Sequence, residues 1–373
     1  MTPKTLTEPR TGPVVTSQAA PVRLIDAAGR PVAAPDDYPE PTHERLLSAY
    51  AHMVAGRRLD AQATALAKQG RLGVYPSSLG QEACQVGAAL VLRESDWLFP
   101  TYRDTVAVIS RGVDPVEALT LMRGSRHCGY DPVRHRTAPQ CTPLATHAPH
   151  AVGLAHGMRL QGRADVVALV LLGDGATCEG DFHEALNLAA VLSAPVVFLI
   201  QNNRYAISTG ADRLSATSSL SGKGVAHGVP SVEVDGNDVA AVLSVLDRAV
   251  GAARAGHGPC LVEAHTYRMA PHTNADDPSR YRDSAEEEQW REQDPIARLD
   301  RFLRSRAVLT DDLAREHRDR ADERAADLRS RIAAELPVDP MSVFDHVYRH
   351  PPAPLQEQRA ALRAELDEGE PRT

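Results

Sequence analysis

Apolar and polar positions between residues 165 and 203 change their spacing twice. Residues 166–172 form a continuous apolar run, which is typical of a strand buried on both faces of a sheet. Between residues 182 and 190 the apolar positions follow a helical spacing, which predicts an amphipathic helix that cannot continue past Pro195. A second apolar run at 196–200 predicts another strand. Together these elements predict a β-α-β unit, in which a right-handed crossover joins two parallel strands.

The same alternation predicts further parts of one sheet. Residues 232–234 and 260–264 are predicted strands on either side of a helix with apolar positions between 239 and 250. Upstream, a helix over 80–92 and a short apolar strand over 97–99 supply another edge. This order of elements favours an α/β fold, with a doubly wound, mostly parallel sheet that carries helices on both faces.

The two ends of the chain differ from this central pattern. Eight prolines lie within the first 41 residues, so residues 1–42 are predicted to form a largely disordered N-terminal arm. Residues 43–300 are expected to form the α/β domain. Residues 301–373 are expected to be a helical C-terminal region, because 311–336 is dense in Arg, Glu, Asp and Ala, most of which favour helices.

Charge and composition exclude several classes of protein. The 373 residues include 41 basic and 49 acidic ones, a formal net charge of −8, so no nucleic-acid partner is expected. The apolar runs are far shorter than the roughly 20 residues that a helix needs to cross a bilayer, so no membrane partner is expected either. Five cysteines without a C-x-x-C pair, and an N-terminus without the features of a signal or transit peptide, favour a cytoplasmic location.

Polar residues follow each strand of the β-α-β unit. Gly173-Asp174-Gly175 ends the first strand, and Asn202-Asn203 follows the second. The carboxyl ends of parallel strands lie at one edge of a sheet, so Asp174 and Asn203 are expected to meet there. A carboxylate and an amide oxygen suit Mg²⁺, and a helix N-terminus after Gly175 suits an anion. The pattern therefore favours a magnesium-bridged diphosphate.

Three other motifs fit the same stretch less well. A dinucleotide-binding fingerprint would need a third glycine where Cys178 stands. A Walker A motif would need Gly-Lys-Ser/Thr where the chain has Gly180-Asp181-Phe182. A zinc-binding helix would need a second histidine at Asn187. NAD, ATP and zinc are therefore disfavoured.

The Gly-Asp-Gly and Asn-Asn pair resembles the thiamine-diphosphate motif. More specifically, residues 43–348 resemble alpha subunits of the decarboxylating first component of 2-oxoacid dehydrogenase complexes, in the branched-chain 2-oxoacid and pyruvate dehydrogenase family. Further short matches occur in the same order along the chain: Gly80-Gln81-Glu82-Ala83, Tyr102-Arg103-Asp104, Pro143-Leu144-Ala145-Thr146, Val234-Asp235-Gly236-Asn237-Asp238, Thr266-Tyr267-Arg268, Pro271-His272-Thr273, Asp276-Asp277-Pro278 and Tyr281-Arg282.

This resemblance implies a set of site residues. Asp174, Asn203 and the backbone carbonyl of Tyr205 would bind magnesium, while Gly175 and Ala176 would offer N–H groups to the diphosphate. The residues expected to contact thiamine diphosphate are Tyr102, Arg103, Thr142, Leu144, Gly173, Asp174, Gly175, Ala176, Asn203, Tyr205 and His272.

Four of these residues have more specific implied roles. Tyr102 and Arg103 would bind phosphate oxygens, for which a hydroxyl and a planar guanidinium are suited. Leu144, on a loop that Thr142 supports, would press against the aminopyrimidine of the coenzyme. His272 would assist acyl transfer to the lipoyl group, because an imidazole titrates near the working pH and can move protons there.

The resemblance also implies an activity and partners. The activity would be oxidative decarboxylation of a 2-oxoacid, followed by reductive acylation of the lipoyl group of an acyltransferase component. In this two-chain family the glutamate that activates the coenzyme belongs to the beta subunit, and no motif for it occurs here. The chain is therefore expected to act in a heterotetramer of two alpha and two beta chains.

The substrate class remains open between two alternatives. The stretches 80–88 and 143–146 favour branched-chain 2-oxoacids, whereas Arg204 and Asp181-Phe182 suit pyruvate equally well. A third alternative is a catalytically silent scaffold subunit, against which the intact Asp174, Asn203 and His272 count.

Three stretches near the matched motifs receive plainer interpretations. Thr273-Asn274-Ala275 replaces the serines that animal relatives use for regulation, so control by their kinase is not expected. Cys141 and His147 stand where the mammalian branched-chain enzymes bind potassium, so potassium is not expected. The acidic run Glu286-Glu287-Glu288 is interpreted as a solvated face.

Overall fold

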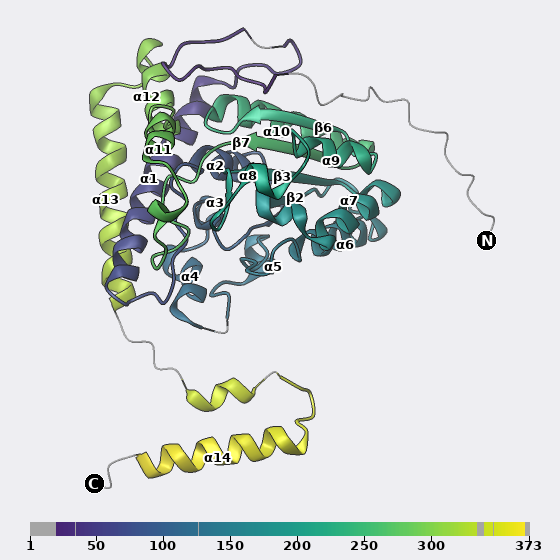
Figure 1. Ribbon diagram of the computed structural model, residues 1–373, viewed down its shortest axis with the longest axis vertical. Coiled ribbons are helices and arrows are strands. Elements are labelled where there is room, and N and C mark those ends of the chain that lie inside the picture. The colour runs from purple at the N-terminus through teal and green to yellow at the C-terminus, as the bar shows by residue number, and fades with distance from the viewer. Residues whose placement is uncertain (1–19, 34, 126, 334–338, 346, 370–373) are drawn as a thin grey trace, which may run out of the picture. The chain divides into compact units, whose positions relative to one another are not determined.

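The computed structural model describes residues 20–33, 35–125, 127–333, 339–345 and 347–369 (Figure 1). The chain divides into a larger unit, Met1–Arg329, and a smaller one, Ser330–Thr373. The larger unit contains a five-stranded sheet. In spatial order its strands are β1 (Trp97–Phe99), β2 (Ala168–Gly173), β3 (Val196–Asn202), β7 (Cys260–His265) and β6 (Ser231–Asp235). All four neighbouring pairs are parallel, which confirms the predicted α/β sheet.

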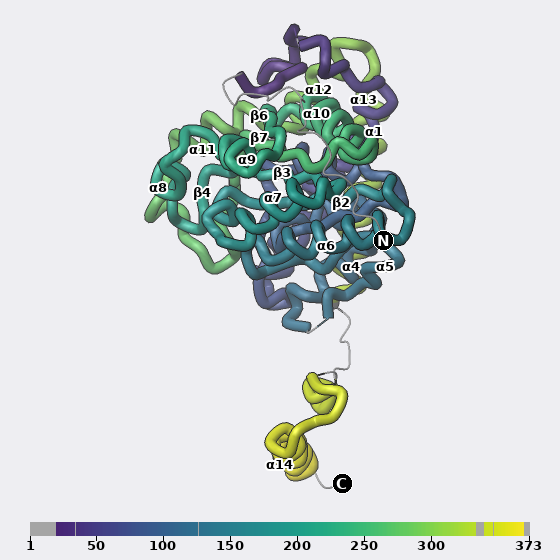
Figure 2. Tube along the Cα trace, turned by 90° about the vertical axis from the view of Figure 1, so that its right-hand side faces the viewer, coloured from purple at the N-terminus to yellow at the C-terminus, as the bar shows by residue number. Residues whose placement is uncertain are grey.

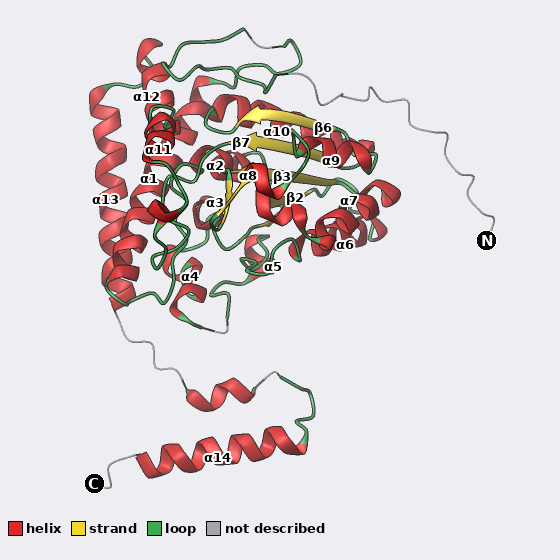
Figure 3. Ribbon diagram, viewed as in Figure 1, coloured by secondary structure: helices red, strands yellow, loops and turns green. Residues whose placement is uncertain are grey.

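Helices cover both faces of this sheet (Figure 3). Alternate residues of β2 point to opposite faces, as the period of two in a strand requires. Leu169 and Leu171 pack in the core beneath α2 (Glu82–Leu90) and α10 (Val239–Ala252). Ala168, Val170 and Leu172 pack beneath α6 (His147–Leu160) and α7 (Gly180–Leu192), which lie side by side (Figures 1 and 2). A strand buried on both faces explains the unbroken apolar run.

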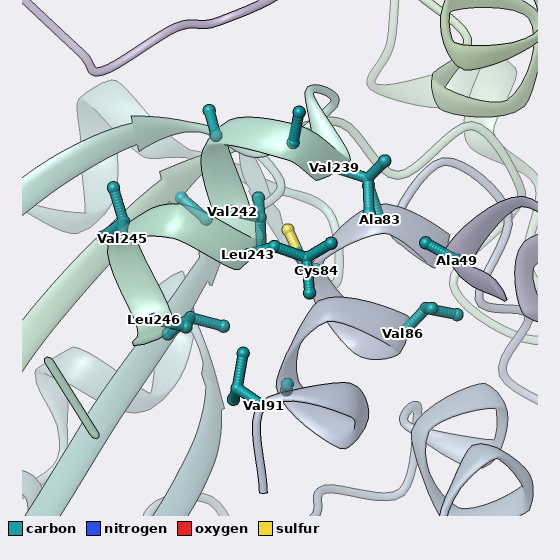
Figure 4. Close-up of a cluster of buried hydrophobic side chains, with 14 of the residues drawn as sticks. Ala49, Ala83, Cys84, Val86, Val91, Val239, Val242, Leu243, Val245 and Leu246 are labelled. Atoms are coloured by element: carbon teal, nitrogen blue, oxygen red, sulfur yellow. The ribbon is translucent and has the colours of Figure 1, made fainter. Parts of the chain in front are cut away.

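Helices α2 and α10 pack against each other through buried apolar side chains (Figure 4). A Cβ atom at Gly87 would lie 2.5 Å from a methyl group of Val242, so glycine allows the two helices to approach closely. The predicted helix over 80–92 begins later than expected, at Glu82. Gly80 has a φ of +95°, and a Cβ there would lie 2.2 Å from the carbonyl oxygen of Tyr267. This glycine brings the start of α2 against the loop that follows β7.

The remaining secondary structure of the described residues consists of short or peripheral elements. Helices are α1 (His43–Lys68), α3 (Thr105–Ser110), α4 (Pro115–Ala118), α5 (Pro132–His135), α8 (Ala211–Leu214), α9 (Ser221–Ala226), α11 (Ser284–Arg291), α12 (Pro295–Ser305), α13 (Asp311–Ala333) and α14 (Ala353–Gly369). Short 3-10 or π turns lie at Leu121–Arg123, Asp174–Cys178, Ala253–His257, Pro278–Arg280 and Pro340–Phe344. A hairpin of β4 (Tyr205–Ala206) and β5 (Thr209–Gly210) follows β3.

The N-terminal segment differs from the predicted disordered arm. Residues 1–19 lie outside the described residues, but Val22 pairs with Val234 of β6 and thereby covers the edge of the sheet. The backbone N–H groups of Leu24 and Ile25 both donate to Oδ2 of Asp238, at 2.7 Å. The proline-rich composition conceals this short apolar stretch, which an exposed sheet edge can bind.

The C-terminal helices agree with the predicted helical extension. Helix α13 ends at Ala333, and residues 334–336 of the predicted helix lie outside the described residues. In the smaller unit, Pro340–Phe344 forms a 3-10 turn and α14 follows it. Within the described residues, no helix combines the length and the apolar character that crossing a bilayer would need.

Candidate functional site

Asp174 lies at the carboxyl end of β2, beside the end of β3. Gly173 pairs in parallel register with Gln201, so Asp174 and Asn203 leave the sheet at the same edge, as predicted. Asp174 is only 3% exposed, and its Oδ2 has no hydrogen-bond partner among the described residues. Burial raises the pKa of this carboxyl to about 6, against the lowering effect of the Gly175 backbone. A buried oxygen without a donor costs about 1–3 kcal/mol, which a bound cation would offset.

The turn after β2 packs tightly against the loop after β3. A Cβ at Gly175 would lie 2.7 Å from the Cβ of Ala206, so this position needs a glycine. The turn is a 3-10 turn over Asp174–Cys178, in which the Thr177 hydroxyl donates to the carbonyl of Asp174 at 2.8 Å. Helix α7 begins only at Gly180, later than expected. The N–H groups of Gly175 and Ala176 therefore belong to this turn and not to α7.

The loop after β3 has an unusual backbone. Arg204 and Ile207 have φ angles of +76° and +55°, which are rare for residues other than glycine and concentrate at functional sites. Asn203 is buried, its Nδ2 donates to Oε1 of Gln81 at 2.8 Å, and its Oδ1 accepts the N–H of Tyr205 at 3.3 Å. The carbonyl of Tyr205, an expected metal ligand, accepts a bond from Nη1 of Arg268 at 3.3 Å.

Two buried arginines converge on His272. Arg103 is 5% exposed and donates to Nδ1 of His272 at 3.0 Å and to its carbonyl at 3.1 Å. Arg268, which is 1% exposed, donates to the same Nδ1 at 3.3 Å and to the carbonyl of Ile207 at 2.7 Å. Among the described residues, neither guanidinium forms an ion pair. Buried arginines normally have an acidic partner, so this pair leaves a place for an anion.

The arginines set the protonation state of His272. Because Nδ1 accepts both guanidinium bonds, the neutral ring carries its proton on Nε2. Burial, followed by Arg103 and Arg268, lowers the pKa of His272 to about 4. The expectation that this imidazole titrates near the working pH is therefore wrong for the chain as described. His272 is neutral at pH 7 and presents an N–H group.

This lowered pKa predicts a dependence of stability on pH. The unfolded chain binds a proton at His272 near pH 6.5, whereas the folded chain does so only near pH 4, so acidification between these values favours unfolding. In the assembled apoenzyme, His272→Asn is expected to reduce the fall in melting temperature between pH 7 and pH 5. His257→Asn, at an exposed histidine, should leave it unchanged. If the melting temperatures of the wild type and His272→Asn fell equally between pH 7 and pH 5, the lowered pKa of His272 would be contradicted.

The other expected contacts border this cluster. The rings of Tyr102 and His272 meet edge to face, with centroids 6.1 Å apart. The N–H of Tyr102 donates to the carbonyl of Cys141 at 3.0 Å, which joins the Tyr102 turn to the loop that carries Thr142 and Leu144. Thr142 is exposed and Leu144 is 40% exposed, so both lie at the rim and outside the buried cluster.

The interpretation of Glu286-Glu287-Glu288 as a solvated face is wrong for Glu286 and Glu287, whereas Glu288 is exposed. Glu286 accepts bonds from the hydroxyl groups of Tyr205 and Tyr267, at 2.7 and 3.1 Å. Glu287 pairs with Arg282 at 2.8 Å. Two of the three acidic residues therefore hold the loops around the site. Of their partners, Tyr267 and Arg282 lie in the matched motifs.

A pocket of about 300 Å³ lies beside Asp174, with Glu263 and His265 in its wall. A possible metal-binding group is formed by the side chains of Glu233, Glu263 and His265. Their ligand atoms, however, already form hydrogen bonds within the protein. Glu263 accepts bonds from Nδ2 of Asn202 at 2.8 Å and from the N–H of Ser221 at 2.7 Å. The Nε2 atom of His265 lies 2.8 Å from Oε2 of Glu233. These hydrogen bonds connect β3, β7 and β6 beside the pocket.

The fold and the buried cluster place the chain among α/β proteins that bind ligands at the carboxyl edge of a parallel sheet. Residues 50–337 match the family model of the dehydrogenase E1 component. The chain therefore belongs to this family, and it is an alpha subunit of a thiamine-diphosphate-dependent 2-oxoacid dehydrogenase, as its motifs predicted.

Individual relatives match nearly the whole chain. The 3-methyl-2-oxobutanoate dehydrogenase subunit alpha of Mycobacterium tuberculosis is 41% identical over 355 residues, which cover 95% of this chain and 96% of the relative. The pyruvate dehydrogenase E1 component subunit alpha of Mycoplasma genitalium is 36% identical over 318 residues, or 85% and 88% of the two chains. That of Staphylococcus aureus strain Mu50 is 36% identical over 340 residues, or 90% and 91%.

Proposed function

We propose that this chain holds magnesium and the diphosphate of thiamine diphosphate at the carboxyl edge of its sheet, and that it decarboxylates a branched-chain 2-oxoacid together with a beta subunit. One observation carries the proposal. A buried carboxylate oxygen of Asp174 lacks a donor, and near it the buried guanidinium groups of Arg103 and Arg268 lack acidic partners. A cation paired with a diphosphate would satisfy all three groups.

The proposed metal ligands are oxygen atoms. Asp174 would supply Oδ2, and Asn203 would supply Oδ1, since its Nδ2 is engaged by Gln81. The carbonyl of Tyr205 accepts one bond from Arg268 and retains a second lone pair. Mg²⁺ uses few protein oxygens and completes its coordination with phosphate and water, which suits these three ligands.

The proposed diphosphate donors surround the metal ligands. Tyr102 and Arg103 would donate to phosphate oxygens, and the N–H groups of Gly175 and Ala176 would add two donors from the turn after Gly173. At the rim, Thr142 would support the loop on which Leu144 presses against the aminopyrimidine. The exposed fraction of Leu144, 40%, suits a side chain that coenzyme and beta subunit would cover.

The protein's part in the chemistry is positioning of the coenzyme and hydrogen-bond donation to the reacting groups. When bound, thiamine diphosphate supplies the electron sink for decarboxylation. His272 carries an N–H group at Nε2 and would donate a hydrogen bond from it to the reacting groups during acyl transfer to the lipoyl group of the acyltransferase component. A silent scaffold subunit would have no need for the unpartnered Asp174 oxygen, which argues against that alternative.

The 41% identical relative bears a name that specifies 3-methyl-2-oxobutanoate, and the 36% identical ones bear names that specify pyruvate. This difference, together with the stretches 80–88 and 143–146, supports a branched-chain substrate. Pyruvate remains the second candidate, because Arg204 and Asp181-Phe182 suit it equally.

We further propose a cytoplasmic heterotetramer with two beta chains, in which residues 43–300 form the coenzyme domain and 301–373 its helical extension.

Co-expression with the beta subunit of the same organism tests partner and substrate together. The chain alone is expected to show no decarboxylation, because it contains no motif for the activating glutamate. The assembled enzyme should use 3-methyl-2-oxobutanoate better than pyruvate by at least about tenfold in kcat/KM, since added methyl groups in an apolar pocket change transition-state binding by about 1–3 kcal/mol. Turnover by the chain alone would contradict the two-subunit proposal, and a preference for pyruvate would reassign the substrate.

A further inference from the structure

We infer that Asp104 determines which end of the Asn203 amide faces the bound cation, although the two residues do not touch. Two glutamine amides, Gln81 and Gln201, transmit this orientation. Asp104 is thus assigned as a positioning residue for the metal ligand. This inference rests on the proposed magnesium site at Asp174 and Asn203.

The four side chains form an unbroken row of hydrogen bonds. Nδ2 of Asn203 donates to Oε1 of Gln81 at 2.8 Å. Nε2 of Gln81 donates to Oε1 of Gln201 at 3.0 Å. Nε2 of Gln201 donates to Oδ1 of Asp104 at 2.7 Å. All four residues are buried, so water cannot easily replace a lost partner.

The row can point in only one direction. Each amide has a donating end and an accepting end, so neighbouring amides must be aligned head to tail. An ionised carboxylate only accepts, and therefore the nitrogen of Gln201 must face Asp104. The other carboxylate oxygen, Oδ2, accepts the N–H and the hydroxyl of Thr101 at 2.7 and 2.6 Å, which holds the carboxylate in place. The reversed row would set two oxygens against each other at Asp104.

This direction ends at the proposed metal ligand. With its nitrogen bound to Gln81, Asn203 must turn its oxygen away from the row. Among the described residues, that oxygen accepts only the 3.3 Å bond from the N–H of Tyr205. An amide nitrogen is no ligand for Mg²⁺, whereas an amide oxygen is. The orientation of Asn203 therefore decides whether it can bind the cation.

Asp104→Asn is expected to reverse the row. The hydrogen bonds from Thr101 require an oxygen at Oδ2, so the new nitrogen takes the Oδ1 position and faces Gln201. Gln201, Gln81 and Asn203 then each turn over, and a nitrogen faces the cation. In the assembled enzyme with thiamine diphosphate, the Mg²⁺ affinity in a calorimetric titration should fall about 10- to 100-fold, the usual cost of losing an outer-shell partner.

The double variant Asp104→Asn/Gln201→Glu separates orientation from general damage. The asparagine nitrogen introduced at position 104 donates to one oxygen of the carboxylate introduced at position 201. The other oxygen of that carboxylate accepts Nε2 of Gln81, so Asn203 regains its original orientation. The charge of the row is unchanged. We therefore expect the double variant to bind Mg²⁺ more tightly than Asp104→Asn does. A merely structural role for Asp104 predicts the opposite, since two buried changes should do more harm than one.

Two further variants complete the test. Asp96→Asn changes another fully buried carboxylate, which bonds Val167 and Arg254 at the amino end of β1, and it should lower stability without changing Mg²⁺ affinity. Gln81→Leu removes the acceptor of the Asn203 nitrogen, so it should weaken Mg²⁺ binding even if Asp104→Asn does not fold.

The outcomes distinguish this inference from the proposed function. Unchanged Mg²⁺ affinity in Asp104→Asn and Gln81→Leu, with loss in Asp174→Ala, would overturn the inference and leave the magnesium site intact. A double variant no better than the single one would overturn it as well. Unchanged affinity in Asp174→Ala would instead refute the magnesium site itself.

Discussion

Replacing Asp174 by alanine is expected to abolish magnesium-dependent binding of thiamine diphosphate to the assembled enzyme. The loss should exceed the roughly 10- to 100-fold that removal of an outer-shell partner costs, because Asp174 is the proposed charged ligand itself. Its Oδ2 is buried without a donor, and burial raises the pKa of the carboxyl to about 6. A bound cation would give this buried oxygen the partner that it lacks.

Melting temperatures can distinguish a role of Asp174 as a metal ligand from a role in folding. A desolvated carboxylate whose Oδ2 lacks a donor contributes little to folding, so Asp174→Ala should melt at the same temperature as the wild-type apoenzyme or higher. Magnesium and thiamine diphosphate together should raise the melting temperature of the wild type, since ligand at 100 times its Kd stabilises by about 2.7 kcal/mol. They should not raise that of Asp174→Ala.

A matched control removes a neighbouring negative charge. Asp181 lies in the first turn of α7 and is partly exposed. Asp181→Ala should keep the calorimetric affinity for magnesium and thiamine diphosphate. If Asp174→Ala kept it too, the carboxylate would be no metal ligand. If both variants lost it, general electrostatics near the turn would explain the effect better than coordination does.

The sheet edge could be predicted because its signals are local. The apolar run of β2, the helical spacing of α7 and the apolar run of β3 each show their period within a few residues. Parallel pairing then follows because a helical crossover joins the two strands, and it places Asp174 and Asn203 together without any knowledge of distant residues.

The arginine and histidine cluster could not be predicted in this way. Arg103, Arg268 and His272 come from loops whose approach depends on tertiary packing, including the close contact of Gly80 with the carbonyl of Tyr267. The resemblance implied a role for two of the three, but it could not indicate that Nδ1 of His272 accepts two guanidinium bonds. That contact reverses the expected protonation behaviour of His272, and it includes Arg103, which is remote from His272 in the sequence.

The row of hydrogen-bonded amides could be predicted only in part from the sequence. Gln201 stands at the carboxyl end of a buried strand, where a polar side chain must find partners, so its sequence position alone indicates a hydrogen bond. Its partners Gln81 and Asp104 belong to matched motifs, yet nothing in their spacing connects them. Only the packing of α2 against the sheet brings the three side chains into one line.

Replacing His272 by alanine is expected to leave coenzyme and magnesium binding nearly intact while reductive acylation of the lipoyl domain falls by about 10²- to 10³-fold, the usual cost of removing one hydrogen-bond donor that stabilises a transition state. Coenzyme binding should survive because Arg103 also donates to the backbone carbonyl of His272 and to that of Ser77, and the substitution removes neither. Single-turnover acylation of a lipoyl domain measures the loss. Decarboxylation with an artificial electron acceptor, which bypasses the lipoyl group, should change far less.

His272→Asn then distinguishes hydrogen-bond donation by His272 from positioning of the arginines. An asparagine oxygen can accept the bonds of Arg103 and Arg268 that Nδ1 now accepts, but the side chain has no group equivalent to Nε2–H. If hydrogen-bond donation from Nε2–H is the role, His272→Asn should acylate as slowly as His272→Ala. Recovery in His272→Asn would assign the residue to holding the guanidinium groups, and an equal loss of coenzyme binding and acylation in His272→Ala would place it in the binding site. His257→Ala, at an exposed histidine, should match the wild type in both assays.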